Sequence, residues 1–139
     1  MVVNIEQSVY NHCQPYLWVA RTEFMMANIK KHSIFFQLPA AKKREVFQVL
    51  QKGKGFNIER IVSCGQATPE GQWLCSKAAE WVIVQRGRAR LRFKGAREPI
   101  ELKAGDYVFI PGKTCHRVEW THPERKTVWL AVHIKNNEG

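Results

Sequence analysis

Short runs of alternating apolar and polar residues dominate the chain from about residue 56 onward. The clearest run is 88–94, in which Ala89, Leu91 and Phe93 alternate with arginine and lysine. A period of two residues is typical of a β-strand with one buried face. Further strand-like runs, separated by turn-forming residues, lie at 56–64, 79–85, 100–102, 107–111, 116–120 and 127–134. So many short strands predict a mostly-β domain built as an antiparallel sandwich or barrel.

The segment before residue 56 has a different period. Val46, Val49 and Leu50 recur at helical spacing, with Phe47 beside them, and the basic residues at 42–44 would lie on the solvent side. This pattern predicts one amphipathic helix at about 39–52, and the glycines that follow would end it.

Residues 1–26 show no clean period. Two interpretations remain open: an N-terminal arm that packs on the domain or on a second subunit, or a non-native extension upstream of a start at Met26. In either case the sequence predicts one β-domain over 27–139, because 139 residues are enough for a single domain.

The composition of the chain bears on its expected location in the cell. No run approaches the roughly 18 apolar residues that a membrane helix needs, and the N-terminus lacks the layout of a signal peptide. We therefore expect a cytoplasmic protein with no membrane partner. The four cysteines are spread singly along the chain, so free thiols are expected and a disulfide framework is not.

Two spaced motifs stand out within the strands. Glu80 precedes Gly87 by seven positions, and Gly105 is followed by Pro111 and then by His116. Together these spacings resemble the two motifs of the cupin superfamily, in the form of a small single-domain bacterial-type cupin whose first metal motif is degenerate. The resemblance implies a single jelly-roll β-barrel, here with the N-terminal helix at about 39–52, and a ligand site in the barrel mouth.

The resemblance also implies a metal site, but this chain departs from the pattern. Metal-binding cupins carry a His-x-His pair ahead of the glutamate, whereas segment 72–77 contains no histidine. Only Glu80 and His116 survive as ligands. His133 and Cys75 are tentative additions, and such a set would suit a divalent Zn or Fe ion. His133 shares a strand face with Trp129, opposite a more apolar face, so both an inward and an outward orientation stay open.

The leading functional hypothesis is binding of a small polar or cyclic metabolite in the barrel mouth, with or without a weakly held divalent metal. The residues expected to line this pocket are Glu80, His116, Trp120, Gln72 and Trp73. A carboxylate beside an imidazole can move protons, but no particular reaction follows, and whether the protein is an enzyme stays open.

Charge suggests an alternative function. The chain carries a formal net charge of +10, and Arg88, Arg90 and Arg92 fall on one strand face. The favoured interpretation is a solvated outer face that discourages edge pairing. The alternative is a non-catalytic regulatory protein that contacts nucleic acid through this face. The resemblance to small cupins adds the expectation of a homodimer.

Overall fold

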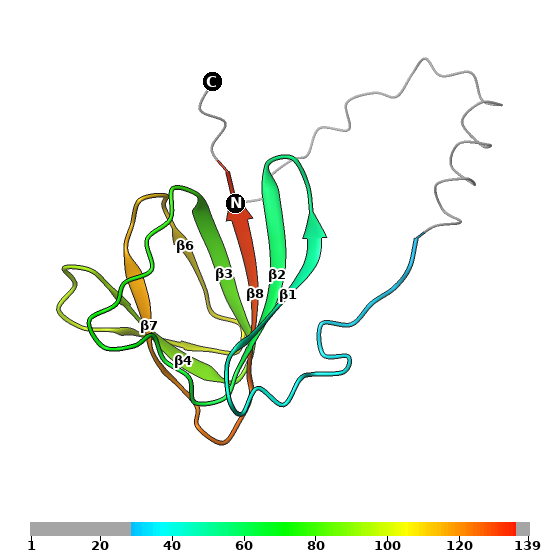
Figure 1. Cartoon of the computed structure of the whole chain (residues 1–139), viewed down its shortest axis with the longest axis horizontal. Helices are drawn as coiled ribbons and strands as arrows, with labels where there is room; N and C mark the ends of the chain where they lie inside the picture. Colours follow the sequence, from blue (N-terminus) through cyan, green and yellow to red (C-terminus); the bar gives the residue numbers. More distant parts are fainter. Residues whose placement is uncertain (1–28, 136–139) are drawn as a thin grey trace, which may run out of the picture. The chain divides into compact units, whose positions relative to one another are not determined.

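The computed structural model describes residues 29–135, and one compact unit begins at Ile34. Its regular elements are all strands (Figure 1). In chain order they are β1 (Val46–Lys52), β2 (Phe56–Ser63), β3 (Ala79–Arg86), β4 (Arg88–Phe93), β5 (Ile100–Lys103), β6 (Tyr107–Ile110), β7 (His116–Thr121) and β8 (Thr127–Ile134). The strands predicted from residue 56 onward are therefore confirmed to within a few residues.

Two antiparallel sheets make up the fold. One has the strand order β1-β2-β8-β3-β6, and the other has the order β5-β4-β7. In the larger sheet β8 pairs with β2 on one side and with β3 on the other. This register places Glu80 of β3 directly opposite His133 of β8. Directly opposed residues share a face of the sheet, so the long-range pairing brings together two residues that lie far apart in the sequence.

The predicted helix at about 39–52 is wrong, because the described residues contain no helix and Val46–Lys52 forms strand β1. β1 pairs with β2 from Val46 opposite Val62 to Lys52 opposite Asn57, with a register shift between Val49 and Gln51. The glycines expected to end a helix instead form the turn of this hairpin, where Gly53 N donates to Phe56 O at 3.0 Å. β-Branched and aromatic residues suit a strand, and pairing with β2 decides the outcome.

The hydrophobic core draws on both sheets. Its buried members are Val82, Val84, Ala89, Leu91, Leu102, Ile110, Trp129 and Ala131. They come from β3, β6 and β8 of the larger sheet and from β4 and β5 of the smaller one, so the core fills the space between the two sheets. On β8 the buried face is the one that carries Trp129 and Ala131, which are 3% and 0% exposed.

Gly87 of the first motif and Gly112, which follows Pro111, occupy positions that require the absence of a side chain. Gly87, between β3 and β4, has a φ of 89°, and a Cβ there would lie 2.7 Å from Lys126 O. A Cβ on Gly112 would lie 2.3 Å from Lys77 O. The absence of a side chain at Gly112 therefore lets the loop after β6 pack closely against the segment that leads into β3. Within the described residues, no helix has the length and apolar character needed to cross a membrane.

Candidate functional site

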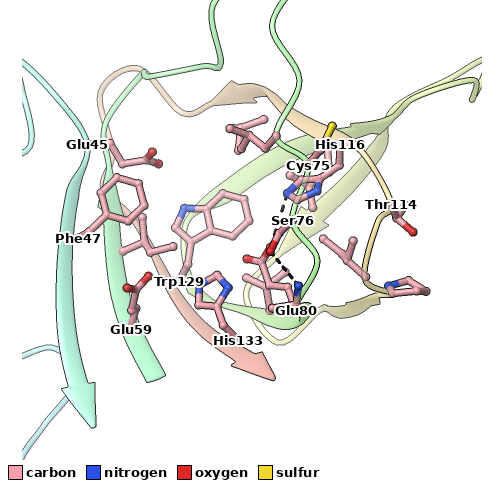
Figure 2. Close-up of a pocket in the computed structure, with 18 residues that line it drawn as sticks. Glu45, Phe47, Glu59, Cys75, Ser76, Glu80, Thr114, His116, Trp129 and His133 are labelled. Carbon is pink, nitrogen blue, oxygen red and sulfur yellow. Dashed lines mark hydrogen bonds and ion pairs between the residues drawn. The ribbon is translucent and has the colours of Figure 1, made fainter. Parts of the chain in front are cut away.

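A cavity of about 300 Å³ opens beside the core (Figure 2). Its lining contains Glu45, Phe47, Glu59, Ile61, Leu74, Cys75, Ser76, Ala78, Glu80, Val82, Leu91, Ile110, Pro111, Thr114, His116, Val118, Trp129 and His133. Most of this lining is apolar, with a few polar groups among the aliphatic and aromatic side chains. That composition is typical of pockets for small organic ligands, and the volume lies at the lower end of their usual range.

Glu80 and His116, the two residues that match the cupin motifs, face each other in this cavity. His116 Nε2 lies 3.7 Å from Glu80 Oε2, and both side chains are largely buried. This distance is too long for a direct hydrogen bond. His116 Nδ1 is also buried and has no hydrogen-bond partner among the described residues. The backbone of His116 pairs with that of Leu74 through bonds of 2.7 and 3.0 Å, and the centroid of the imidazole lies 6.1 Å from that of the Phe93 ring.

A second carboxylate–imidazole pair lies next to the first. His133 Nε2 is 3.3 Å from Glu59 Oε2, and Asn57 Nδ2 donates to the other oxygen of Glu59 at 2.8 Å. Because His133 is directly opposite Glu80 in the β3–β8 register, the two pairs are neighbours. His133 lines the cavity, which settles the orientation that the sequence left open: the face shared with Trp129 is the inner one.

Glu45 supplies a third carboxylate at the cavity wall. Ser63 Oγ donates a short hydrogen bond to Glu45 Oε1, and Trp129 Nε1 donates to Ser63 Oγ at 3.1 Å. Burial raises the pKa of the Glu45 carboxyl group, and the hydrogen bond from Ser63 partly opposes this effect. This chain of hydrogen bonds ties the start of β1 to β2 and β8.

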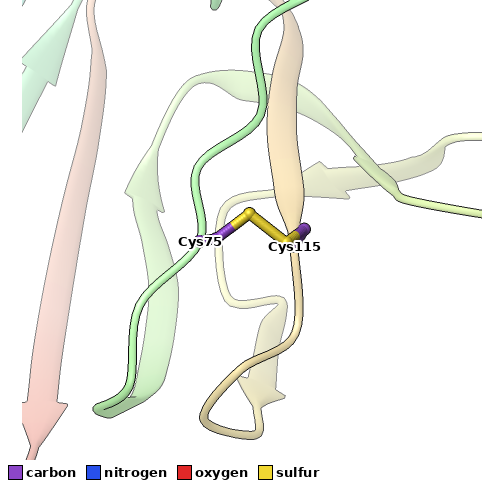
Figure 3. Close-up of a disulfide and its surroundings, with 2 residues drawn as sticks. All are labelled: Cys75 and Cys115. Atoms are coloured by element: carbon purple, nitrogen blue, oxygen red, sulfur yellow. A yellow bond between two sulfur atoms is a disulfide. The ribbon is translucent and has the colours of Figure 1, made fainter.

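The segment before β3 is fastened over the same cavity. Cys75 and Cys115 form a disulfide with a Cα–Cα distance of 4.4 Å (Figure 3). The expectation of four free thiols is therefore wrong for these two residues, whereas Cys64 is free. Spacing along the chain could not reveal the pair, because Cys75 and Cys115 are 40 residues apart and the backbone bridge between Leu74 and His116 brings them together.

The side chains present do not fit the metal site that the cupin fold implies. Within residues 29–135 no group of three or more His, Cys, Asp or Glu side chains converges as a metal site. Cys75, one of the tentative ligands, has its sulfur in the disulfide, and a metal ligand must be a thiolate. Glu80 and His116 alone fall short of the three or more protein ligands that hold divalent metals in most sites.

The remaining residues expected in the pocket lie elsewhere. Trp120 is a cross-strand partner of Arg90, whose guanidinium lies 5.2 Å from the indole centroid. Trp73 makes the corresponding contact with Arg117, at 5.9 Å. Gln72 lines a smaller hollow of about 200 Å³ that shares Glu45 with the main cavity. None of these three belongs to the main cavity lining.

The arginine stripe on β4 is largely paired with glutamates. Arg88 and Arg90 both contact Glu101, and Arg92 Nε lies 2.8 Å from Glu119 Oε1. The carboxylate of Glu119 raises the pKa of Arg92 further. Such pairing on a solvated face is consistent with the favoured interpretation of the stripe, and it leaves fewer unpaired cations for a phosphate backbone.

Sequence reasoning missed two of the three cavity carboxylates. Glu45 fell in the middle of the predicted helix, and Glu59 lay in a strand whose alternation was mixed. A signal was present for Glu59, because it alternates with Ile61 and Ser63 on one face of β2. A charged residue on the same strand face as apolar neighbours is a candidate for a partly buried site.

Comparison with known proteins agrees with this architecture. The cupin domain family model matches residues 67–133, which include both motifs. A solved structure from Ralstonia eutropha JMP134, provisionally assigned as a mannose-6-phosphate isomerase, is 41% identical. The match covers 77% of this chain and 99% of that one, with a TM-score of 0.74. The chain therefore belongs to the cupin superfamily.

More distant structures show the same fold. A cupin superfamily protein from Desulfitobacterium hafniense DCB-2 is 13% identical over 71% of this chain and 84% of that one, with a TM-score of 0.60. An RmlC-like cupin with a double-stranded β-helix fold from Methanocaldococcus jannaschii is 19% identical over 77% and 92%, with a TM-score of 0.57. Among curated proteins nothing matches.

Proposed function

We propose that this cupin binds a small, partly polar metabolite in the cavity between its sheets, with Glu80 and His116 as the principal polar contacts. The observation that carries the proposal is the state of His116. Its Nδ1 is buried without a partner among the described residues, and its Nε2 is too far from Glu80 for a hydrogen bond. A buried polar group without a hydrogen bond costs about 1–3 kcal/mol, and a ligand group placed between Glu80 Oε2 and His116 Nε2 would give both atoms the hydrogen bond that their 3.7 Å separation does not allow them to make directly.

The same pair gives the cavity a capacity for proton transfer. A carboxylate and an imidazole held 3.7 Å apart can take a proton from one atom of a bound ligand and return it to another. Isomerisation, the reaction class provisionally assigned to the Ralstonia eutropha relative, is therefore the activity to assay first on any ligand found. Binding is the part of the proposal that the geometry supports directly.

Substitution of the histidine tests the binding proposal. A metabolite screen by thermal shift, followed by calorimetry, should identify a ligand whose Kd rises at least tenfold in His116→Ala. Because His116 is buried, Glu80→Gln provides a second variant of nearly unchanged shape, and it should weaken binding in the same direction. His122→Ala, which removes a histidine outside the cavity, is the matched control. An unchanged Kd in both cavity variants would rule out this site.

Metal content is a separate prediction. We expect protein purified without chelators to hold well under one equivalent of transition metal, and to bind added Zn²⁺ or Fe²⁺ only weakly, because Glu80 and His116 lack further ligands. Mass spectrometry of the metal content measures this directly. One equivalent of tightly held metal that disappears in His116→Ala would contradict the prediction.

A further inference from the structure

The polar lining of the cavity is acidic in a strongly basic protein. Three glutamates and two histidines line it, and no lysine or arginine of the described residues does so. The whole chain, in contrast, carries a formal net charge of +10. With the three carboxylates ionised, the lining has a charge between minus three and minus one, depending on the two imidazoles. When both histidines are protonated, each imidazolium still has a carboxylate beside it, Glu80 for His116 and Glu59 for His133.

The lining is also rich in hydrogen-bond acceptors. The glutamates contribute six carboxylate oxygens, whereas the indole Nε1 of Trp129 already donates to Ser63. Among the described residues, the carboxylate oxygens of Glu80 accept no hydrogen bond, and Glu59 Oε2 has only His133 Nε2, at 3.3 Å. An ammonium group brings three donors and no acceptor, and so it matches this inventory.

Aromatic side chains add a second attraction for a cation. Phe47 and Trp129 both line the cavity, and in Figure 2 the indole ring lies among the labelled carboxylates and imidazoles. The face of an aromatic ring carries negative electrostatic potential and attracts ammonium groups. The aliphatic residues Ile61, Val82 and Leu91 complete a surface for an apolar ligand body.

We infer that the cavity selects a small organic cation, a primary amine on an apolar or cyclic body, with its ammonium group beside Glu80 and Glu59, at the end of the cavity where His133 lies. This inference rests on the proposed function, because it names the ligand class of the same cavity. His116, about nine-tenths buried and with Nδ1 unpartnered among the described residues, marks the wall of the site.

The inference separates this chain from the provisional assignment of its relative. A sugar phosphate carries a dianionic group, and such groups are normally held by arginine, lysine or clustered backbone N–H donors. Placed in this cavity, a phosphate would meet three carboxylates and no lysine or arginine side chain of the described lining. Like-charge contacts of this kind act against the wrong ligand.

Three probes of matched shape test the charge preference: benzylamine, benzyl alcohol and benzoate. Mannose 6-phosphate is added as a sugar phosphate. Titration of ¹⁵N-labelled full-length protein, followed by NMR, reports both affinity and location. We expect benzylamine to shift saturably the amides of Glu59, Glu80 and His116, with a Kd at least tenfold lower than that of benzyl alcohol or benzoate.

Charge-removing variants then test the residues. Glu59→Gln and Glu80→Gln should each raise the Kd for benzylamine at least fivefold while changing that for benzyl alcohol less than twofold. Glu70→Gln, which removes an exposed carboxylate outside the cavity, should change neither.

The two proposals fail in different ways. If benzyl alcohol, benzoate or mannose 6-phosphate shifts the cavity amides at lower concentration than benzylamine, the cation preference is overturned and cavity binding stands. If none of the probes shifts these amides, the cation preference is overturned as well. If, in addition, no ligand from the metabolite screen depends on His116, cavity binding is overturned with it.

Discussion

Glu45 combines a buried carboxyl group with a hydrogen bond from Ser63, at the point where β1 begins. Burial raises its pKa above the ordinary value of 4.5. The folded protein therefore binds this proton more tightly than the unfolded chain does. The resulting contribution to stability is fully present below the ordinary pKa and is lost as the pH rises through the pKa of the folded state.

Glu45→Gln should remove this pH dependence. Glutamine keeps the side-chain oxygen that accepts from Ser63 and is neutral at every pH. We expect the free energy of unfolding of the variant, relative to that of the native sequence, to rise as the pH increases above the ordinary pKa of 4.5. Urea denaturation at a series of pH values measures the difference, with Glu70→Gln as the surface control. A difference that stays constant, or falls, as the pH increases would contradict the assignment.

At the scale of elements, the short segment ahead of β3, residues 74–76, forms part of the cavity wall together with the strands. It reaches the start of β7 through the Leu74–His116 bridge, and the Cys75–Cys115 disulfide covalently fixes the contact. Lys113 N donates to Ser76 O at 2.6 Å on the other side. Because Leu74, Cys75 and Ser76 all line the cavity, the disulfide stabilises part of the binding site.

Removal of the disulfide should destabilise the fold. The bond closes a loop with a sequence separation of 40, for which constraint of the unfolded chain predicts about 2–4 kcal/mol of stability. We expect a loss in that range for Cys75→Ser combined with Cys115→Ser, measured by urea denaturation. The native protein in dithiothreitol should match the double variant, and Cys64→Ser should resemble the native protein. Insensitivity of the native protein to the reductant would show that the bond is not formed.

Across the described part of the molecule, the arginines of β4 lie on an exposed face, whereas three glutamates line the cavity. Arg88 and Arg90 share Glu101 on β4 and β5, whereas the cavity carboxylates have histidine or serine partners. Surface ion pairs of this kind contribute little to stability. The cytoplasmic location and the homodimer stay predictions, and the arm or extension at 1–26 lies outside the described residues.

What the sequence determined by itself was the set of strands and the motif pair. Strict alternation along 88–94 and the turn glycines defined β3 to β8, and the spacing of Glu80, Gly105 and His116 indicated the cupin fold. These features are local or depend on fixed spacing along the chain. They can therefore be recognised without knowing which segments pair in three dimensions.

Tertiary pairing decided the rest. Val46–Lys52 became a strand because β2 offered an edge to pair with, which outweighs a helical period. His133 faces inward because the register of β8 buries Trp129 and Ala131 on the same face. Cys75 reached Cys115, and Glu59 reached His133, only through long-range contacts. Side-chain proximity across sheets depends on register and packing, and neither is written in the spacing of residues along the chain.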